Sequence, residues 1–269
     1  MRMLNNLISK SFKSISWTLI QTIFLNILQI SQALILLKYL TPYDYGEIAF
    51  MAIVYNLSLI ITTSGIGTVV ITSKIITKDL INKLFTINLL ISIVISLLIL
   101  IAANFISNSE QYYFVNKYIY HYVALLIINS IFIIPNALLI KKFEHKKIAI
   151  SYIFSTLISF SAAVYFASKN YAAYTVIYSL IIQSLINTII HLKYVNFKFN
   201  LNFNFNISDK AEIIRGFHLM FSQLISSASN TISTFFISKN FNVKSLGIFN
   251  RAEKFSIIPA SLIKSSISN

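Results

Sequence analysis

The chain has 269 residues, of which 56% are hydrophobic and 11% are charged, and its formal net charge at pH 7 is +14. An ordinary soluble domain carries roughly 25% charged residues, so this composition excludes a water-soluble globular protein. The basic residues alternate between dense and sparse connections along the chain, which argues against a nucleic-acid-binding protein.

Apolar runs follow one another along the chain, and about 20 mainly apolar residues suffice for a helix to cross a membrane. The basic start of the chain lacks a small-residue cleavage site, so the first run is predicted to be an uncleaved helix. The predicted fold class is all-α, a polytopic membrane protein of about eight transmembrane helices. The predicted spans are Trp17–Leu37, Ile48–Ser73, Leu84–Ile106, Tyr120–Ile140, Ile148–Ser168, Ala172–His191, Gly216–Ser238 and Ile248–Ser268.

Basic residues are far more frequent in the connections that share a side with the N-terminus. Since an excess of Lys and Arg in short loops marks the cytoplasmic side, a cytoplasmic N-terminus is predicted. The opposite side holds Lys38, Lys117, Lys169, Lys239 and Lys244. The N-terminal side holds Arg2, Lys10, Lys13, Lys74, Lys78, Lys83, Lys141, Lys142, Lys146, Lys147, Lys193, Lys198, Lys210 and Arg215.

Polar residues form a stripe on the first predicted span, within about 140° of arc on an α-helix. Such a stripe faces either neighbouring helices, where amides hold helices together, or a water-filled cavity. For a cavity, the predicted lining also includes Asn56 of the second span and Asn230 of the seventh. Gly65, Gly67, Pro135 and Pro259 are predicted break points of their helices. The stripe consists of Thr18, Gln21, Thr22, Asn26, Gln29 and Gln32.

Charged residues are scarce inside the predicted spans. Among the acidic residues only Glu253 is expected at membrane depth, which argues against an ion-coupled antiporter because such proteins use intramembrane carboxylates. Arg251, Glu253 and Lys254 enter the eighth span together. Two interpretations of Arg251 remain: bidentate binding of a pyrophosphate, or an interfacial pair with Glu253 that extends outward.

Residues for catalysis or metal binding are not recognisable in the sequence. There is no Cys, and His121, His145, His191 and His218 lack the spacing of metal ligands. The loops opposite the N-terminus are short, whereas a membrane glycosyl polymerase needs catalytic loop residues. We therefore expect no enzyme, no catalytic residues, no metal and no cofactor.

An internal repeat divides the chain, since Lys38–Gly46 aligns without gaps to Lys239–Gly247. Both segments follow a span on the same side, which predicts a parallel duplication of lobes. The predicted organisation is a six-helix lobe at 1–192, a cytoplasmic linker at 193–212 and two helices of an incomplete second lobe at 213–269. Alternating Asn and Phe in the linker predict a short strand or an interfacial segment. The chain is expected to be C-terminally truncated.

Several motifs resemble, in order, those of the Wzx/WzxC-like flippases. They are the turn Leu40-Thr-Pro-Tyr-Asp-Tyr-Gly46, Ser64-Gly-Ile-Gly67 with Lys74, Asn136-Ala-Leu-Leu-Ile-Lys-Lys-Phe143 with Lys146 and Lys147, and Lys239 through Leu246-Gly247 to Asn250-Arg-Ala252 and Pro259.

The resemblance implies a polysaccharide exporter of the MOP superfamily, with MATE-like six-helix lobes, in the bacterial cytoplasmic (inner) membrane. Members move undecaprenyl-pyrophosphate-linked oligosaccharide repeat units for O-antigen, lipopolysaccharide or exopolysaccharide synthesis. The expected partners are that lipid-linked oligosaccharide, membrane lipids, a polysaccharide polymerase and a chain-length regulator, with no nucleic acid. The expected cavity residues are Gln21, Asn26, Gln29, Gln32, Asn56, Asn230 and, for the pyrophosphate, Arg251.

Two other functions remain open at this point. One is a MATE-type drug antiporter of the same superfamily, which the missing intramembrane carboxylate disfavours. The other is an inactive fragment or membrane scaffold in a polysaccharide assembly complex, because the resemblance implies that transport requires both lobes around a shared cavity. The first span also lacks the Arg or Lys that a cationic pocket would use.

Overall fold

The computed structural model describes residues 2–73, 76–196, 200–204 and 207–253. The predicted all-α fold is confirmed, since these residues contain helices and no strand, and the alternative of a short linker strand fails for residues 200–204. A further helical stretch covers residues 243–253. The elements are α1 (Arg2–Leu36), α2 (Pro42–Thr72), α3 (Lys78–Ile106), the short 3-10 helix η1 (Glu110–Tyr112), α4 (Phe114–Lys141), α5 (His145–Ser168), α6 (Tyr174–Val195) and α7 (Ile207–Asn240).

In the described residues, six helices are long and apolar enough to cross a membrane, namely those of α1 to α6. The prediction of eight is therefore confirmed only for its first six. Although α7 is longer than the predicted seventh span, its many hydroxyl side chains, such as Ser222, Ser226 and Ser227, lower its hydropathy. Most of the predicted eighth span lies outside the described residues.

Capping residues extend the helices beyond their apolar runs. α2 begins at Pro42 rather than Ile48, because Thr41 and Asp44 form a reciprocal capping box around the first turn. The Asp44 carboxylate accepts from the Thr41 amide at 2.8 Å, and the Thr41 hydroxyl accepts from the Asp44 amide at 3.2 Å. At the predicted break point Pro135 the helix is not interrupted, since α4 continues across it, and Pro259 lies outside the described residues.

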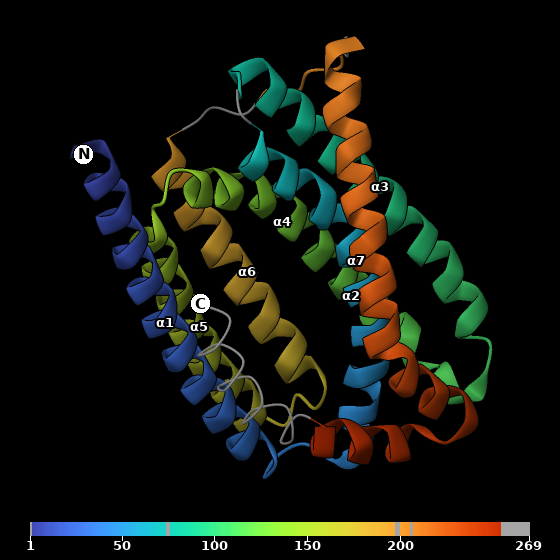
Figure 1. Cartoon of the computed structure of the whole chain (residues 1–269). Coiled ribbons are helices and arrows are strands. Elements are labelled where there is room, and N and C mark those ends of the chain that lie inside the picture. The colour runs from blue at the N-terminus through green and yellow to red at the C-terminus, as the bar shows by residue number, and fades with distance from the viewer. Residues whose placement is uncertain (1, 74–75, 197–199, 205–206, 254–269) are drawn as a thin grey trace.

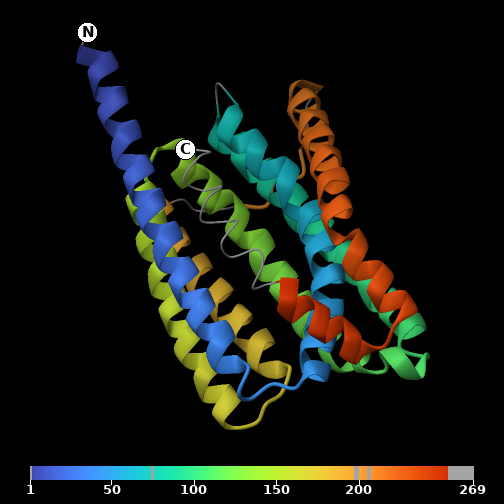
Figure 2. The ribbon, with the colours of Figure 1, turned by 60° about the horizontal axis from the view of Figure 1, so that its bottom comes forward.

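The helices form two groups on either side of α4, as Figures 1 and 2 show. α1 packs on α5 and α5 on α6 in one group, while α2 packs on α7 and α3 in the other. α4 contacts α2, α3 and α6 and so joins the groups. We call the end at which α1, α3, α5 and α7 begin and α2, α4 and α6 finish the basic end. The end that carries connections 37–41, 107–113, 169–173 and 241–242 is the opposite end.

Buried polar side chains bind the helices to one another. The Asn88 amide of α3 donates to the Ser130 carbonyl of α4 at 2.6 Å. The Asn187 carbonyl oxygen of α6 accepts from Ser151 and Ser155 of α5, both at 3.0 Å. In an apolar surrounding these groups need partners within the protein, so the bonds stabilise the helix pairs.

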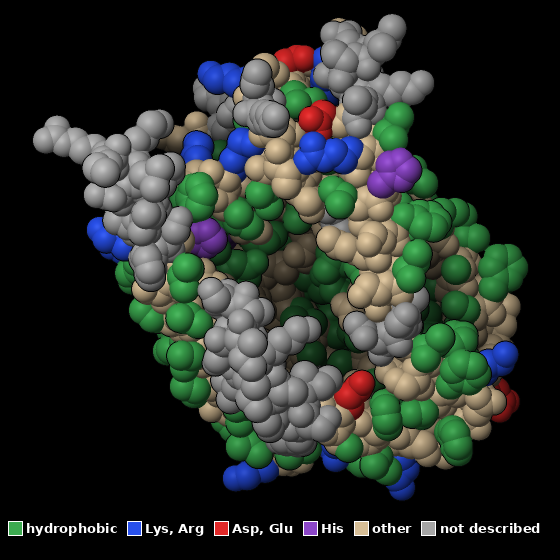
Figure 3. Space-filling model, viewed as in Figure 1, with side chains coloured by type: hydrophobic (Ala, Val, Ile, Leu, Met, Phe, Trp, Pro, Cys, Tyr) green, Lys and Arg blue, Asp and Glu red, His purple; other side chains and the backbone are tan. Residues whose placement is uncertain are grey.

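The outside of the bundle matches a lipid environment. Ile93, Val94, Leu97, Leu98 and Ile101 of α3 are all exposed. Figure 3 shows Lys and Arg side chains towards the two ends of the view and a mostly hydrophobic middle. An apolar belt between charged ends is the surface that a bilayer requires.

Candidate functional site

The face seen in Figure 3 is hollowed in its middle, where Figure 1 has α6 on one side and α2 and α7 on the other. Hydrophobic and neutral side chains surround the hollow in this view. The hollow lies between the two groups of helices that α4 connects. We therefore take it, with the helix contacts beside it, as the candidate site.

The polar stripe of α1 turns towards the bundle. The Thr18 hydroxyl lies 3.3 Å from Nδ1 of His145, and the Ser14 hydroxyl donates to the Phe143 carbonyl at 3.5 Å. The other side of α1 carries Ile20 and Ile27, which are more than half exposed. Near Thr18 the stripe thus holds α1 to the α4–α5 connection and α5, which is one of its two predicted roles.

The four α1 amides further along the stripe differ in exposure. Gln29 is exposed, and Gln21, Asn26 and Gln32 are half-buried. The Asn26 side-chain nitrogen is buried and has no hydrogen-bond partner. Within the described residues no hydrogen bond joins any two of these amides, so the structure puts them on one helix without uniting them in a cluster. The role of these amides as cavity residues therefore stays a prediction.

The two predicted cavity residues from other helices are separate from this stripe. Asn56 lies in α2 and is exposed. Asn230 lies in α7, and its side chain is outside the described residues. Neither therefore has a described contact with Gln21, Asn26, Gln29 or Gln32.

At the opposite end, α2 crosses the helical stretch 243–253 at two glycines. A Cβ atom added to Gly46 would collide with the Val243 carbonyl, and one added to Gly247 would collide with the Pro42 carbonyl. The sequence repeat aligns Pro42 with Val243 and Gly46 with Gly247. Each repeat copy therefore makes the same contact with the other, as two-fold-related surfaces do. We call Pro42, Gly46, Val243 and Gly247 the opposite-end contact.

Arg251 reaches across this contact rather than outward. Its Nη2 donates to the Leu40 carbonyl at 2.5 Å, and its guanidinium carbon lies 4.2 Å from the centre of the Tyr45 ring. The Nε atom is buried without a hydrogen-bond partner. The arrangement combines a charge-assisted hydrogen bond with a cation–π contact. The structure thus directs Arg251 to Leu40 and Tyr45 rather than outward, and both earlier interpretations, an interfacial pair with Glu253 and binding of a pyrophosphate, stay predictions.

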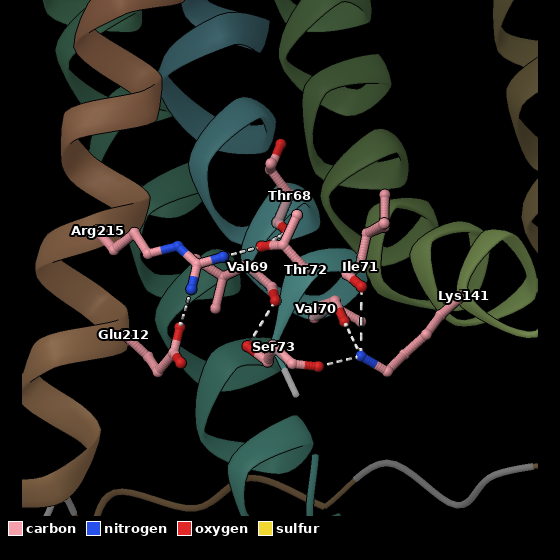
Figure 4. A network of polar contacts seen from close by, with 9 residues as sticks. All are labelled: Thr68, Val69, Val70, Ile71, Thr72, Ser73, Lys141, Glu212 and Arg215. Carbon is pink, nitrogen blue, oxygen red and sulfur yellow. Dashed lines mark hydrogen bonds and ion pairs between the residues drawn. The ribbon is translucent and has the colours of Figure 1, made fainter. Parts of the chain in front are cut away.

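At the basic end, α2 meets α7 at a second pair of glycines. A Cβ atom at Gly65 would collide with the Gly216 carbonyl, whereas one at Gly216 would lie 3.3 Å from a Val69 methyl group. Arg215 bonds the Thr72 hydroxyl and pairs with Glu212 at 3.4 Å, as Figure 4 shows. The basic-end contact consists of Gly65, Thr72, Glu212, Arg215 and Gly216.

Lys141 of α4 closes the same end of α2 from the other side (Figure 4). Its ammonium donates to the carbonyls of Val70, Ile71 and Ser73 at 3.0, 3.3 and 2.5 Å. These carbonyls end α2 and have no partner within the helix, and the ammonium also complements the negative end of the helix dipole.

Glu47 is a residue whose position the sequence interpretation missed. It lies in the candidate span Pro42–Thr72 and is only 6% exposed. Its carboxylate accepts from the Tyr118 hydroxyl at 2.9 Å. The sequence interpretation placed Glu47 before the second span, which was predicted to start at Ile48, whereas the capping box starts α2 earlier and includes Glu47 in the helix. The Thr41-Pro42-Asp44 signature was the signal that placed it inside the helix.

No group of three or more metal-ligating side chains occurs among the described residues. His191, the most buried histidine, faces Ser151 at 3.1 Å and the Asn187 carbonyl at 2.8 Å, so it belongs to the α5–α6 packing.

Comparison with protein families gives one finding. The model of a family described as "polysaccharide biosynthesis protein" matches residues 35–269. The search of curated proteins and the search of solved structures found no match. The matched segment includes both copies of the repeat and both glycine contacts of α2.

Proposed function

The chain belongs to the polysaccharide biosynthesis protein family, and from this premise we propose that it is a Wzx/WzxC-like flippase of the MOP superfamily. Its proposed substrate is an undecaprenyl-pyrophosphate-linked oligosaccharide repeat unit, which it moves across the bacterial cytoplasmic membrane. The proposal assigns transport and no catalysis. The transported units are then used to build surface polysaccharides such as O-antigen, lipopolysaccharide or exopolysaccharide.

The observation that carries the proposal is the opposite-end contact. Two aligned segments 201 residues apart in sequence, Lys38–Gly46 and Lys239–Gly247, meet through equivalent atoms. Duplicated lobes that face each other across a shared hollow are the architecture in which alternating access takes place. This supports the division into a six-helix lobe at 1–192, a linker at 193–212 and a second lobe that starts at 213.

In the proposed cycle the hollow holds the sugar units. The amides Gln21, Asn26, Gln29 and Gln32 of α1, with Asn56 and Asn230, bond sugar hydroxyls as the substrate crosses. Arg251 attracts the pyrophosphate once its bond to the Leu40 carbonyl breaks and the opposite-end contact separates. A ligand drives such a change only by binding one state better than the other, and the freed guanidinium provides that difference.

The proposed orientation has the basic end in the cytoplasm. Lys141, Lys142, Lys146 and Lys147 lie there, and short loops rich in Lys mark the cytoplasmic side. The substrate is then loaded beside the basic-end contact and released beside the opposite-end contact.

The test is restoration of surface polysaccharide in a flippase-deficient bacterial strain. We expect the chain, expressed with any in-frame continuation of its gene, to restore the polysaccharide, and Gln29→Leu with Asn26→Leu to reduce it while membrane levels stay unchanged. Absence of restoration, together with co-purification of a polysaccharide polymerase or chain-length regulator, would support a membrane scaffold instead.

A drug antiporter is a second candidate because Glu47 supplies a buried carboxylate within a candidate span. Intramembrane carboxylates carry the coupling ion in such proteins. Glu47→Gln keeps the bond from Tyr118 but removes the titratable group. Under the flippase proposal this variant still restores polysaccharide, whereas proton-dependent drug efflux that Glu47→Gln abolishes would support the antiporter.

A further inference from the structure

A cavity at the basic end is separate from both glycine contacts of α2. Its volume is about 410 Å³. Its walls come from the α2–α3 connection and from α3, α4 and α6, so the six candidate spans build it without α7. The lysine cavity is lined by Ile76, Lys78, Ile81, Leu138, Lys141, Lys142 and Val195.

The cavity combines apolar walls with positive charge. Ile81, Leu138 and Val195 are buried and form an apolar floor, whereas Lys78 and Lys142 are exposed at its rim. Pockets of small molecules typically have about 300–1,000 Å³, so 410 Å³ has room for more than an inorganic anion. An anion with an apolar part fits these apolar walls and lysines better than a small inorganic anion does.

The charge of the cavity is not neutralised by acidic neighbours among its lining residues. The nearest carboxylates in sequence are engaged elsewhere: Asp79 pairs with Lys83 at 2.6 Å, and Glu144 pairs with Lys147 at 3.3 Å. The ammonium of Lys141 donates its hydrogen bonds to carbonyls at the end of α2, but its positive charge still lies in the wall of the lysine cavity. Lys78 and Lys142 are thus the side chains that would donate to an anion.

The position of the cavity matches the surface of a bilayer. Lys78 is the first residue of α3, and Lys142 directly follows α4, so both lie where candidate spans end. Basic pockets between transmembrane helices at this depth recognise the headgroups of anionic lipids.

We propose that the lysine cavity binds the phosphate headgroup of an anionic membrane lipid, with its glycerol and upper acyl chains against Ile81, Leu138 and Val195. The phosphate lies between Lys78 and Lys142. The site uses none of the residues assigned to the sugar substrate, so its occupancy can be tested separately from transport.

The experiment measures lipid retained by the whole chain, purified in detergent, by native mass spectrometry. The probes are phosphatidylglycerol, phosphatidylcholine and soluble glycerol phosphate. We expect one phosphatidylglycerol to be retained in preference to phosphatidylcholine. Removal of two lysines near the surface should weaken it about 30-fold in the double variant Lys78→Gln, Lys142→Gln.

Two controls separate the site from general surface charge. Lys146→Gln with Lys193→Gln removes two exposed lysines of the same end that do not line the cavity, and retention should stay unchanged. Lys78→Arg with Lys142→Arg keeps the charges and should keep the lipid. Equal retention of the two lipids by the original chain, or equal loss in both Gln pairs, would overturn the proposal.

Two further measurements locate the bound molecule and show whether it is a lipid or a soluble phosphate. Because the chain has no Cys, Ile76→Cys offers a single position for a benzophenone label in the cavity wall. We expect this label to cross-link phosphatidylglycerol. If glycerol phosphate displaces the lipid at similar concentrations, the site binds a soluble phosphate and the lipid assignment is wrong.

Discussion

Each end of α2 contacts the chain beyond residue 206 through a pair of glycines and an arginine, but the geometry of the two contacts differs. At each end a glycine of α2 meets a glycine of the chain beyond residue 206, and an arginine of the facing helix reaches α2 or the turn before it. At the opposite end both glycines abut backbone carbonyls. At the basic end only Gly65 does, and the Gly216 side retains space.

The arginine at the opposite end, Arg251, is also more enclosed than the arginine at the basic end, Arg215. Arg251 is half-buried against Tyr45 and has an enclosed Nε, whereas the Arg215 side chain is 43% exposed and its partner Glu212 is 30% exposed. An ion pair in contact with water contributes little and is screened by salt. The difference indicates that the basic-end contact separates more easily, which agrees with the proposed loading of substrate from that side.

The largest effect should come from a methyl group in the opposite-end contact. In Gly46→Ala or Gly247→Ala the Cβ atom meets a backbone carbonyl that moves only if the two helices separate. We expect the free energy of unfolding to fall by about 1–3 kcal/mol, the usual cost of overpacking. Thermal unfolding in detergent measures this. Gly67→Ala is the matched control, because its Cβ would meet only the Ile133 side chain, at 3.1 Å.

Equal losses at Gly46, Gly67 and Gly247 would mean that the losses do not come from the backbone contact between Gly46 and Gly247, because loss of glycine flexibility in a helix would by itself stabilise the protein. In that case the comparison between the two ends loses its basis. A loss at Gly46 and Gly247 that spares Gly67 supports the two-fold contact.

The basic-end contact should respond unequally to the same change. Gly65→Ala places a Cβ atom on the Gly216 carbonyl, while Gly216→Ala finds its nearest atom 3.3 Å away in a methyl group of Val69. We expect Gly65→Ala to lose about 1–2 kcal/mol and Gly216→Ala to be close to neutral. The same unfolding measurement compares them. If both substitutions prove equally harmful, the asymmetry between the two ends of α2 is wrong.

Arg251 should show a smaller effect that depends on Tyr45. Arg251→Ala removes one bond to the Leu40 carbonyl and the cation–π contact, together about 1–2 kcal/mol. In a double-mutant cycle with Tyr45→Leu, we expect the two losses to be less than additive. If the losses of the two single variants add exactly in the double variant, Arg251 and Tyr45 do not stabilise the protein through their mutual contact. Loss of surface polysaccharide without any change in the unfolding midpoint would indicate that Arg251 acts on the substrate alone.

The sequence predicted most of this fold because periodic apolar runs determine where helices form. Each of the first six predicted spans falls on an observed helix, although the predictions overrun the helices at Leu37, at Ser73 and at Ala172–Ala173. The observed starts of α2 and α3 are earlier than predicted, because Thr41 and Thr77 cap them. The candidate site was harder to predict. Repeat alignment paired Gly46 with Gly247, but the fact that these glycines touch follows only from tertiary packing. Likewise, the buried state of Glu47 depends on Tyr118 in a different helix.

The glycines show a use that the sequence interpretation did not distinguish. α2 is helical from Pro42 to Thr72, across the predicted break points Gly65 and Gly67, and Gly65 lies where α2 meets α7. Of the five glycines in the chain, Gly46, Gly65, Gly216 and Gly247 lie at the two contacts of α2. In membranes small residues let helices approach closely. The sequence alone does not distinguish a glycine that serves this packing from a glycine that serves as a hinge.

The smallest effect should come from Arg215, and its salt dependence tests the proposed order of opening. Arg215→Ala removes the pair with Glu212 and the bond to Thr72, but this side chain is 43% exposed. The expected loss is at most about 1 kcal/mol, and it should shrink further as salt rises towards 1 M, where the Debye length is about 3 Å. The loss in Arg251→Ala should change little with salt, because that guanidinium is half-buried. Equal salt dependence of the two variants would contradict a basic end that opens first.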